Sequence, residues 1–171
     1  MSIDSFHTVI LPLKDKLFRL AYSIVRERAE AEDILQDVLL KLWCKRDEWT
    51  YIENLEAYCF RITKNAALDK LASMAVRKMG VIDPEKENLY FVENRSPHSE
   101  MVRKEQRAAI GRSIEALSEN QRLVFTLREI EGMSYREIAE ALSISEDLVK
   151  ISLHRARRNM KEMLSVYHKD E

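Results

Sequence analysis

The chain has 171 residues, of which 46% are hydrophobic and 33% are charged, a balance typical of a folded globular protein. This length suits one ordinary domain or two small ones with modest cores. With only three glycines, three prolines and little strand-like alternation, the sequence predicts an all-α fold. There is no signal-peptide pattern, and no apolar run approaches the roughly 20 residues of a membrane span. We therefore expect a cytoplasmic protein without membrane insertion.

The sequence offers little chemistry for an enzyme. Cys44 and Cys59 lie within helical patterns and form no CxxC pair, and the four histidines are scattered. Buried or half-buried thiols are therefore a better interpretation of the cysteines than a zinc site. No glycine-rich phosphate loop, nucleophile elbow or metal-ligand cluster is present. We expect no cofactor, no metal and no catalytic residue.

The net charge of −1 hides a segregation of charge along the chain. Residues 60–78 and 149–164 each carry five basic side chains against one acidic, whereas residues 26–37 carry five acidic side chains against two basic. Any one of these segments is compatible with a solvated helix face. Together they predict nucleic-acid binding at two places and a basic protein partner at a third.

Three helices are predicted in the first half of the chain. Apolar positions recur at helical spacing over residues 14–26, and Pro12 suits the first turn of this helix or the break before it. A second helix with a wide apolar stripe is expected over about residues 31–45. After a polar stretch, a third is expected over about residues 55–77, and its pattern leaves open a kink or a break.

A linker separates these helices from the second half of the chain. Residues 79–98 contain Gly80, Pro84 and Pro97, have several acidic side chains and show no sustained period. A helix is then expected over about residues 101–117. The composition therefore predicts two small helical domains joined by a flexible linker.

Short capping motifs divide the rest of the chain into three helices. The sequence 118–121 is a capping-box pattern that would begin a helix which Gly132 can end. A second capping box at 134–137 would begin a short helix to Leu142. Ser145 can cap the last helix, which is expected to continue to about Leu164.

Residues 134–158 have the form of a helix-turn-helix. Ala139 is the small residue needed where the two helices cross, and Ser143 stands where such a turn usually carries glycine. One face of the last helix is apolar, with Val149, Leu153, Ala156, Met160 and Leu164. The other side presents Lys150, Ile151, His154, Arg155 and Arg158.

A helix that enters the major groove needs one face packed against the protein and another that presents hydrogen-bond donors to bases and phosphates. The alternative is an amphipathic bundle helix with solvated arginines. Because the turn, the caps and the basic face agree, the pattern favours DNA binding.

The same segment resembles region 4 of extracytoplasmic-function (ECF) sigma factors of the sigma-70 family. The resemblance lies in LSENQRLVFTLREIEG at 117–132, MSYREIAEAL at 133–142 and LVKISLHRAR at 148–157. It implies recognition of the −35 promoter element, with bases or phosphates facing Lys150, Ile151, His154, Arg155 and Arg158 and with the backbone steadied by Arg128, Ser134 and Tyr135. Family members often have Ser-Arg where this chain has Ile151 and Ser152, a departure consistent with a different promoter sequence.

The first half of the chain is similar to region 2 of the same family. The sequence AEAEDILQDVLLKLW at 29–43 resembles region 2.2, which grips the β′ clamp of RNA polymerase. Asp33, Gln36 and Asp37 match its clamp-contacting positions and, at i, i+3 and i+4, lie on one side of a helix. Without the resemblance, ordinary surface acidity would explain them equally well. Trp43, at the end of the stripe, suits the core better than a contact.

The sequence AYCFRITKNAALDKL at 57–71 resembles regions 2.3 and 2.4, which recognise the −10 element. The resemblance implies that Asn65 lines a pocket for a flipped base, with the loop 49–55 as its wall, and that Arg61, Lys64 and Lys70 hold phosphates. Trp49 and Tyr51 are candidates for the pocket, and core or surface aromatics are the alternative.

The resemblance as a whole implies a sigma factor that binds core RNA polymerase and directs promoter-specific initiation, without being an enzyme. It assigns region 2 to residues 1–78, a linker to 79–100 and region 4 to 101–171. An anti-sigma partner is left open. The rival interpretations are a homodimeric helix-turn-helix regulator, a helical adaptor that binds only proteins and, last, an all-helical enzyme.

Overall fold

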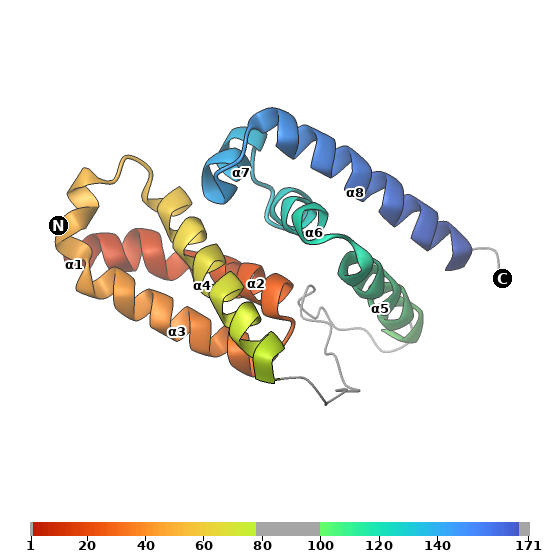
Figure 1. Ribbon diagram of the computed structural model, residues 1–171, viewed down its shortest axis with the longest axis horizontal. Helices are drawn as coiled ribbons and strands as arrows, with labels where there is room; N and C mark the ends of the chain where they lie inside the picture. The colour runs from red at the N-terminus through yellow and green to blue at the C-terminus, as the bar shows by residue number, and fades with distance from the viewer. Residues whose placement is uncertain (1, 78–99, 168–171) are drawn as a thin grey trace.

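The computed structural model describes residues 2–77 and 100–167, and every regular element in these two ranges is a helix (Figure 1). The predicted all-α class is confirmed. The predicted linker, apart from residue 100, lies outside the described residues.

The first half of the chain is built around three long helices. Its elements are α1 (Ser2–Ser5), the π-helical turn η1 (Phe6–Ile10), α2 (Leu11–Val25), α3 (Arg28–Cys44), the 3₁₀ helix η2 (Arg46–Tyr51) and α4 (Leu55–Arg77). The helices α2, α3 and α4 pack against one another in pairs. The predicted apolar stripes face this packing, because Leu17, Leu20 and Val38 are almost completely buried.

The helix α4 is continuous from Leu55 to Arg77, without a break. Residues 55–77 contain neither glycine nor proline, the residues that most often interrupt a helix. The sequence showed no single apolar stripe here because α4 is covered on two sides. It packs on α2 and α3 with one part of its surface and on α7 of the second half with another.

The second half of the chain contains the predicted helix-turn-helix. Its elements are α5 (Glu100–Ala116), α6 (Glu119–Phe125), the π-helical turn η3 (Thr126–Ile130), α7 (Tyr135–Leu142) and α8 (Glu146–Tyr167). The long helix α8 packs on α5, α6 and α7. Its contacts are made by the predicted apolar face, where Val149, Leu153 and Ala156 are buried.

The turn between α7 and α8 is made by a serine at the position where such turns usually carry glycine. Ser143 is left-handed, with φ 56° and ψ 46°, the conformation that favours glycine. The amide of Ile144 donates to the carbonyl of Ala139 (3.0 Å), which closes the turn. Ser145 then caps α8, because its hydroxyl accepts a hydrogen bond from the amide of Leu148 (3.1 Å).

Of the two predicted capping boxes, one forms and one does not. At the start of α7 the amide of Glu137 donates to the hydroxyl of Ser134 (3.1 Å) and the amide of Ser134 to the carboxylate of Glu137 (2.7 Å). At the start of α6, Ser118 makes no side-chain cap. The reciprocal bond is also missing because the Gln121 amide oxygen accepts from the Asn159 amide instead (3.0 Å), tying α6 to α8.

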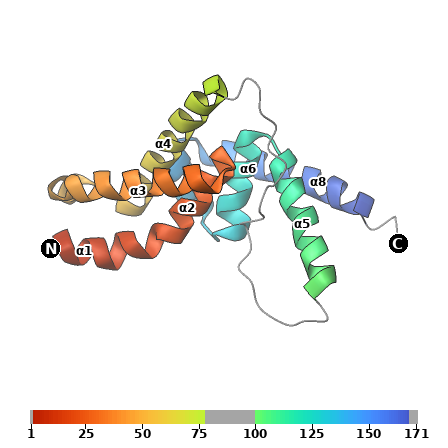
Figure 2. The same cartoon turned by 90° about the horizontal axis from the view of Figure 1, so that it is seen from below.

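The two halves are packed against each other. Figure 1 shows α7 beside α4, and Figure 2 shows α6 next to α2. Buried apolar side chains from both halves form one continuous cluster, from Ile10 to Met160. The predicted pair of small domains therefore shares an interface in this structure.

Candidate nucleic-acid and polymerase interfaces

The predicted polymerase-binding residues lie together on the outer side of α3. Asp33, Gln36 and Asp37 are all exposed, while Ile34 and Val38 between them are buried. The helix therefore holds the acidic side chains on one fixed face. Carboxylates displayed in this way are suited to basic side chains of a partner.

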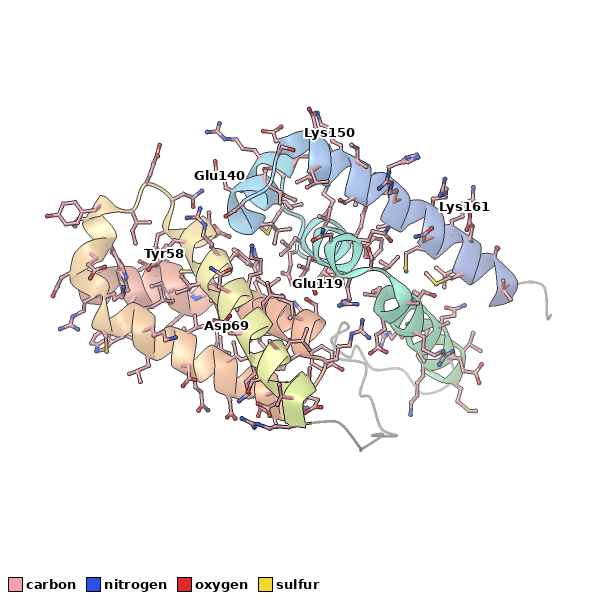
Figure 3. All side chains as sticks on the ribbon, viewed as in Figure 1. Tyr58, Asp69, Glu119, Glu140, Lys150 and Lys161 are labelled. Carbon is pink, nitrogen blue, oxygen red and sulfur yellow. The ribbon has the colours of Figure 1, made fainter. Side chains whose placement is uncertain are left out.

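The predicted −35 residues of α8 also share one exposed face. Lys150, Ile151, His154, Arg155 and Arg158 are exposed, and Figure 3 shows Lys150 and Lys161 along the outer side of α8. Ile151 is an apolar member of this face, with 48% of its surface accessible. Ser152, at the position where the family resemblance implied arginine, points inward and is 6% exposed.

The remaining predicted −35 residues meet at the turn before α7. The Arg128 guanidinium lies 4.9 Å from the centre of the Tyr135 ring and donates to the carbonyl of Met133 (2.7 Å). The Ser134 hydroxyl is used in the cap of α7. These side chains fix the entry to the helix-turn-helix, and Ser134 and Tyr135 also mark the N-terminal end of α7, where helices attract anions.

The predicted −10 pocket residue Asn65 and the predicted wall of that pocket lie at two separate cavities. Asn65 is exposed and lines a cavity of about 230 Å³ with Val38, Lys41 and Asp69. The loop residues 52–55 line a separate cleft of about 850 Å³, together with Arg136 and Glu140. Asn65 and that loop are therefore not combined in a single pocket in this structure.

The aromatic candidates for the −10 pocket differ in their burial. Trp49 is 7% exposed and stacks on Phe6, with ring centres 6.2 Å apart, so it belongs to the core. Tyr51 is 89% exposed. Trp43 is half-buried, in a T-shaped contact with the Phe6 ring and with the Arg46 guanidinium 4.9 Å from the centre of its own ring.

Three of the four predicted −10 residues are engaged by other parts of the chain. The Arg61 guanidinium donates to the carbonyl of Glu140 (3.3 Å), and the Lys64 ammonium donates to the carbonyl of Leu142 (2.9 Å). Burial, helped by the nearby positive charge of Arg61, lowers the pKa of the Lys64 ammonium. Lys70 forms an ion pair with Glu30 at 2.8 Å.

Sequence reasoning missed the polar residues that join the two halves. The Arg19 guanidinium makes a two-pronged ion pair with Glu131, whose side chain is only 2% exposed. Arg122, itself 4% exposed, donates from Nε to the carbonyl of Ser23 (2.7 Å). No motif marks these residues, because their partners are about a hundred positions away along the chain.

The described residues offer no alternative chemical centre. In residues 2–77 and 100–167, no group of three or more histidines, cysteines and carboxylates is placed to hold a metal ion. Burial raises the pKa of the Cys59 thiol to about 12, which makes it a poor nucleophile, and Cys44 is exposed. Within the same ranges, no helix has the length and apolar character required to cross a membrane.

Two family models match the chain, one in each half. The model for Sigma-70 region 2 matches residues 9–76, and the model for Sigma-70, region 4 matches residues 107–160. Both matches fall where the sequence motifs predicted them, and they occur in the expected order.

Curated sigma factors are similar to the chain over almost its full length. The RNA polymerase sigma-H factor of Pseudomonas aeruginosa is 27% identical over 167 residues, which is 94% of this chain and 86% of that protein. The ECF RNA polymerase sigma factor SigW of Bacillus subtilis is 26% identical, covering 94% and 89%. The ECF RNA polymerase sigma-E factor of Escherichia coli is 27% identical, covering 90% and 83%.

Solved structures have the same fold. The sigma factor RpoE of Bartonella quintana, in complex with the anti-sigma factor NepR, matches with a TM-score of 0.73 at 24% identity, covering 94% of this chain and 97% of that one. CnrH, in complex with the cytosolic domain of CnrY, matches with a TM-score of 0.67 at 21% identity, covering 95% and 89%.

Matches to both sigma-70 regions, and to sigma factors across nearly the whole chain, support the interpretation as a sigma factor, a class of initiation factor that is not catalytic. Sigma factors are not catalysts; they bind core RNA polymerase and promoter DNA and direct promoter-specific initiation. The chain belongs to the sigma-70 family, as a sigma factor of the ECF type.

Proposed function

We propose that three helices of this sigma factor each bind a different target. The exposed acidic face of α3 (Asp33, Gln36 and Asp37) binds the β′ clamp of core polymerase. The helix α4 binds the −10 element through Arg61, Lys64, Asn65 and Lys70. The exposed face of α8 binds the −35 element, with Arg128, Ser134 and Tyr135 at its entrance.

The observation that carries the proposal is the construction of the helix-turn-helix. The cap at Ser134, the left-handed turn at Ser143 and the cap at Ser145 fix the start of α8. One side of that helix is buried and the other presents cations and His154 to solvent. This is the arrangement that a helix needs to dock in the major groove.

The boundaries and the setting follow from the same assignment. We assign region 2 to residues 1–78 and region 4 to residues 101–171, with residues 79–100 as the connection. A protein that works on polymerase and chromosomal DNA acts in the cytoplasm. Since two of the similar solved structures are complexes, one with the anti-sigma factor NepR and one with the cytosolic domain of CnrY, we also propose an inhibitory partner of this kind.

Run-off transcription with core polymerase tests the assignment, on a promoter obtained by mapping transcript starts after overexpression. We expect Asp37→Arg to abolish co-purification with core polymerase, and Arg155→Ala to reduce −35-dependent transcription about tenfold, as expected for loss of one good base or phosphate contact.

The matched controls are Glu105→Arg and Arg103→Ala, exposed positions on α5 outside the three proposed surfaces. Both should behave like the unaltered protein. Unchanged polymerase binding by Asp37→Arg would remove α3 from the proposal, and unchanged promoter preference with Arg155→Ala would remove Arg155.

A further inference from the structure

A row of four side chains that can donate to phosphates runs along one edge of the exposed face of α8. They follow one another at the helical spacing i, i+4, i+7 and i+11, and all of them are exposed: Lys150, His154, Arg157 and Lys161. Figure 3 shows the first and the last, Lys150 and Lys161, on the outer side of the helix. Arg157 therefore lies beside the proposed −35 surface without belonging to it.

The guanidinium of Arg157 is paired with a carboxylate from another element. Its Nε and Nη2 donate to the same oxygen of Glu129, at 2.6 and 2.5 Å, and Glu129 belongs to the π-helical turn η3. The residue before it, Arg128, is one that the proposed function places at the entrance of the helix-turn-helix. The pair therefore joins the edge of α8 to the edge of that entrance.

This ion pair is not what holds α8 in place. The side chains of Arg157 and Glu129 are 50% and 36% exposed, and pairs this open to water contribute little to stability. The helix is fixed by its buried face, which includes Leu153 and Ala156. We therefore look for the effect of the pair in binding rather than in folding.

The pair changes what the edge of α8 offers to DNA. A free arginine that neutralises a phosphate releases counterions and strengthens binding to any sequence. Arg157 and Glu129 together carry no net charge, and two donors of the guanidinium are already used. The carboxylate of Glu129 also repels phosphates that approach this edge.

We propose that Glu129 takes the place of a DNA phosphate on Arg157 and thereby lowers the sequence-independent affinity of the −35 surface. This inference rests on the proposed function of α8. Phosphate contacts carry no sequence information directly, whereas base contacts do. With one phosphate contact withheld, binding by α8 depends more on the base contacts of residues such as Arg155.

Releasing Arg157 in the full-length protein tests the proposal. Glu129→Gln removes the carboxylate charge with almost no change in size. Binding to a short fluorescent duplex of randomised sequence is followed by anisotropy between about 50 and 200 mM salt. One additional phosphate contact should make the slope of log affinity against log salt steeper by about 0.9, which corresponds to roughly eightfold tighter binding at about 0.1 M salt.

The double variant Glu129→Gln/Arg157→Met assigns the gain to Arg157. It has the net charge of the unaltered protein and should return both the affinity and the slope to the unaltered values. Arg157→Met alone should leave the slope nearly unchanged. A slope reduced by about 0.9 in that variant would overturn the proposal, because it would mean that Arg157 already binds a phosphate.

The matched control is Glu105→Gln, which removes an exposed carboxylate from α5 and should change neither affinity nor slope. Glu129→Gln that binds no better than this control would overturn the proposal, and so would a gain that persists in the double variant. The proposed function of α8 is judged separately: it fails if binding by the unaltered protein does not weaken with salt and Arg155→Ala leaves −35-dependent transcription unchanged.

Discussion

Ile151 is the apolar member of an otherwise polar and basic face of α8. It is 48% exposed, and its neighbours on this face, Lys150, His154 and Arg155, are exposed as well. In the major groove, an apolar side chain has one group to recognise specifically, the 5-methyl of thymine. A serine at this position would offer a hydrogen bond instead, so the residue influences which −35 sequence is preferred.

We predict that Ile151 contacts a thymine methyl in the −35 element. Replacing that thymine with deoxyuridine should weaken binding by the unaltered protein roughly fourfold, because one buried methyl is worth about 0.8 kcal/mol. Ile151→Ser should remove this difference. Competition binding with duplexes substituted at one thymine at a time measures it.

The control is Val166→Ser, an exposed apolar position near the end of α8. It should keep the full sensitivity to deoxyuridine. If Ile151→Ser retained that sensitivity at the same thymine, the assigned contact would be wrong.

At the scale of the elements, the two serine caps show how tertiary contacts select among local signals. Ser118 and Ser134 both precede a helix and have a suitable residue three positions later. Glu137 is free to complete its box, whereas Gln121 is drawn to Asn159 on α8. A capping motif therefore predicts where a helix begins better than it predicts the hydrogen bonds of its cap.

Replacing these two serines should separate the roles of the caps. We expect Ser134→Ala to lower the free energy of unfolding by about 1 kcal/mol, the usual loss of an N-cap. Ser118→Ala should change it by much less, because Ser118 makes no cap hydrogen bond. Urea unfolding at neutral pH measures the free energy of unfolding of both variants. Equal losses in the two variants would contradict the claim that only Ser134 caps its helix.

The cap of α7 should also depend on pH. Hydrogen bonds from the Ser134 amide and hydroxyl lower the pKa of the Glu137 carboxyl, so its ionised form stabilises the folded state. This contribution is complete above the unfolded pKa of about 4.3 and is lost as the pH falls through the lower, folded pKa. The difference in free energy of unfolding between the unaltered protein and Glu137→Gln should therefore become smaller at acidic pH. A difference that stays constant with pH would contradict a stabilising role of the ionised Glu137 carboxylate.

At the scale of the whole molecule, the two halves share one core and a set of charged hydrogen bonds. Arg122 is the clearest example, because it is 4% exposed and joins Ser23 of α2 to Leu117 before α6. A buried guanidinium must keep such partners, since an unpaired charge inside a protein is costly. The halves are therefore expected to stabilise each other.

We predict that the free protein unfolds in a single transition. Both tryptophans, Trp43 and Trp49, lie in the first half, so their fluorescence reports on that half while far-ultraviolet circular dichroism reports on all helices. The two signals should give the same midpoint. Arg122→Met should lower the midpoint, because it removes charged hydrogen bonds worth about 2–3 kcal/mol. In Arg122→Met, fluorescence and circular dichroism should also give different midpoints.

The matched control is Arg158→Met, an exposed arginine whose distance to Glu162 is 4.0 Å. It should leave the midpoint nearly unchanged, as is usual for surface ion pairs. Different fluorescence and circular dichroism midpoints in the unaltered protein would show that the halves unfold independently.

The sequence by itself determined the helical class, the approximate bounds of the long helices and the helix-turn-helix. These features depend on local spacing: apolar periodicity placed Leu17 and Val149 in the core, and short-range caps placed the start of α7 at Ser134. The family and its order of regions were equally accessible, because the motifs are contiguous stretches of chain.

Only the tertiary structure decided what the basic residues of α4 contact and how the halves meet. Arg61 and Lys64 suit a phosphate or a helix C-terminus equally well, and α7 reached them from about 80 positions away. The continuity of α4 was hidden for the same reason, since a helix covered on two sides has no single apolar stripe. Partners that are distant in sequence leave no periodic signal, so these contacts required the folded chain.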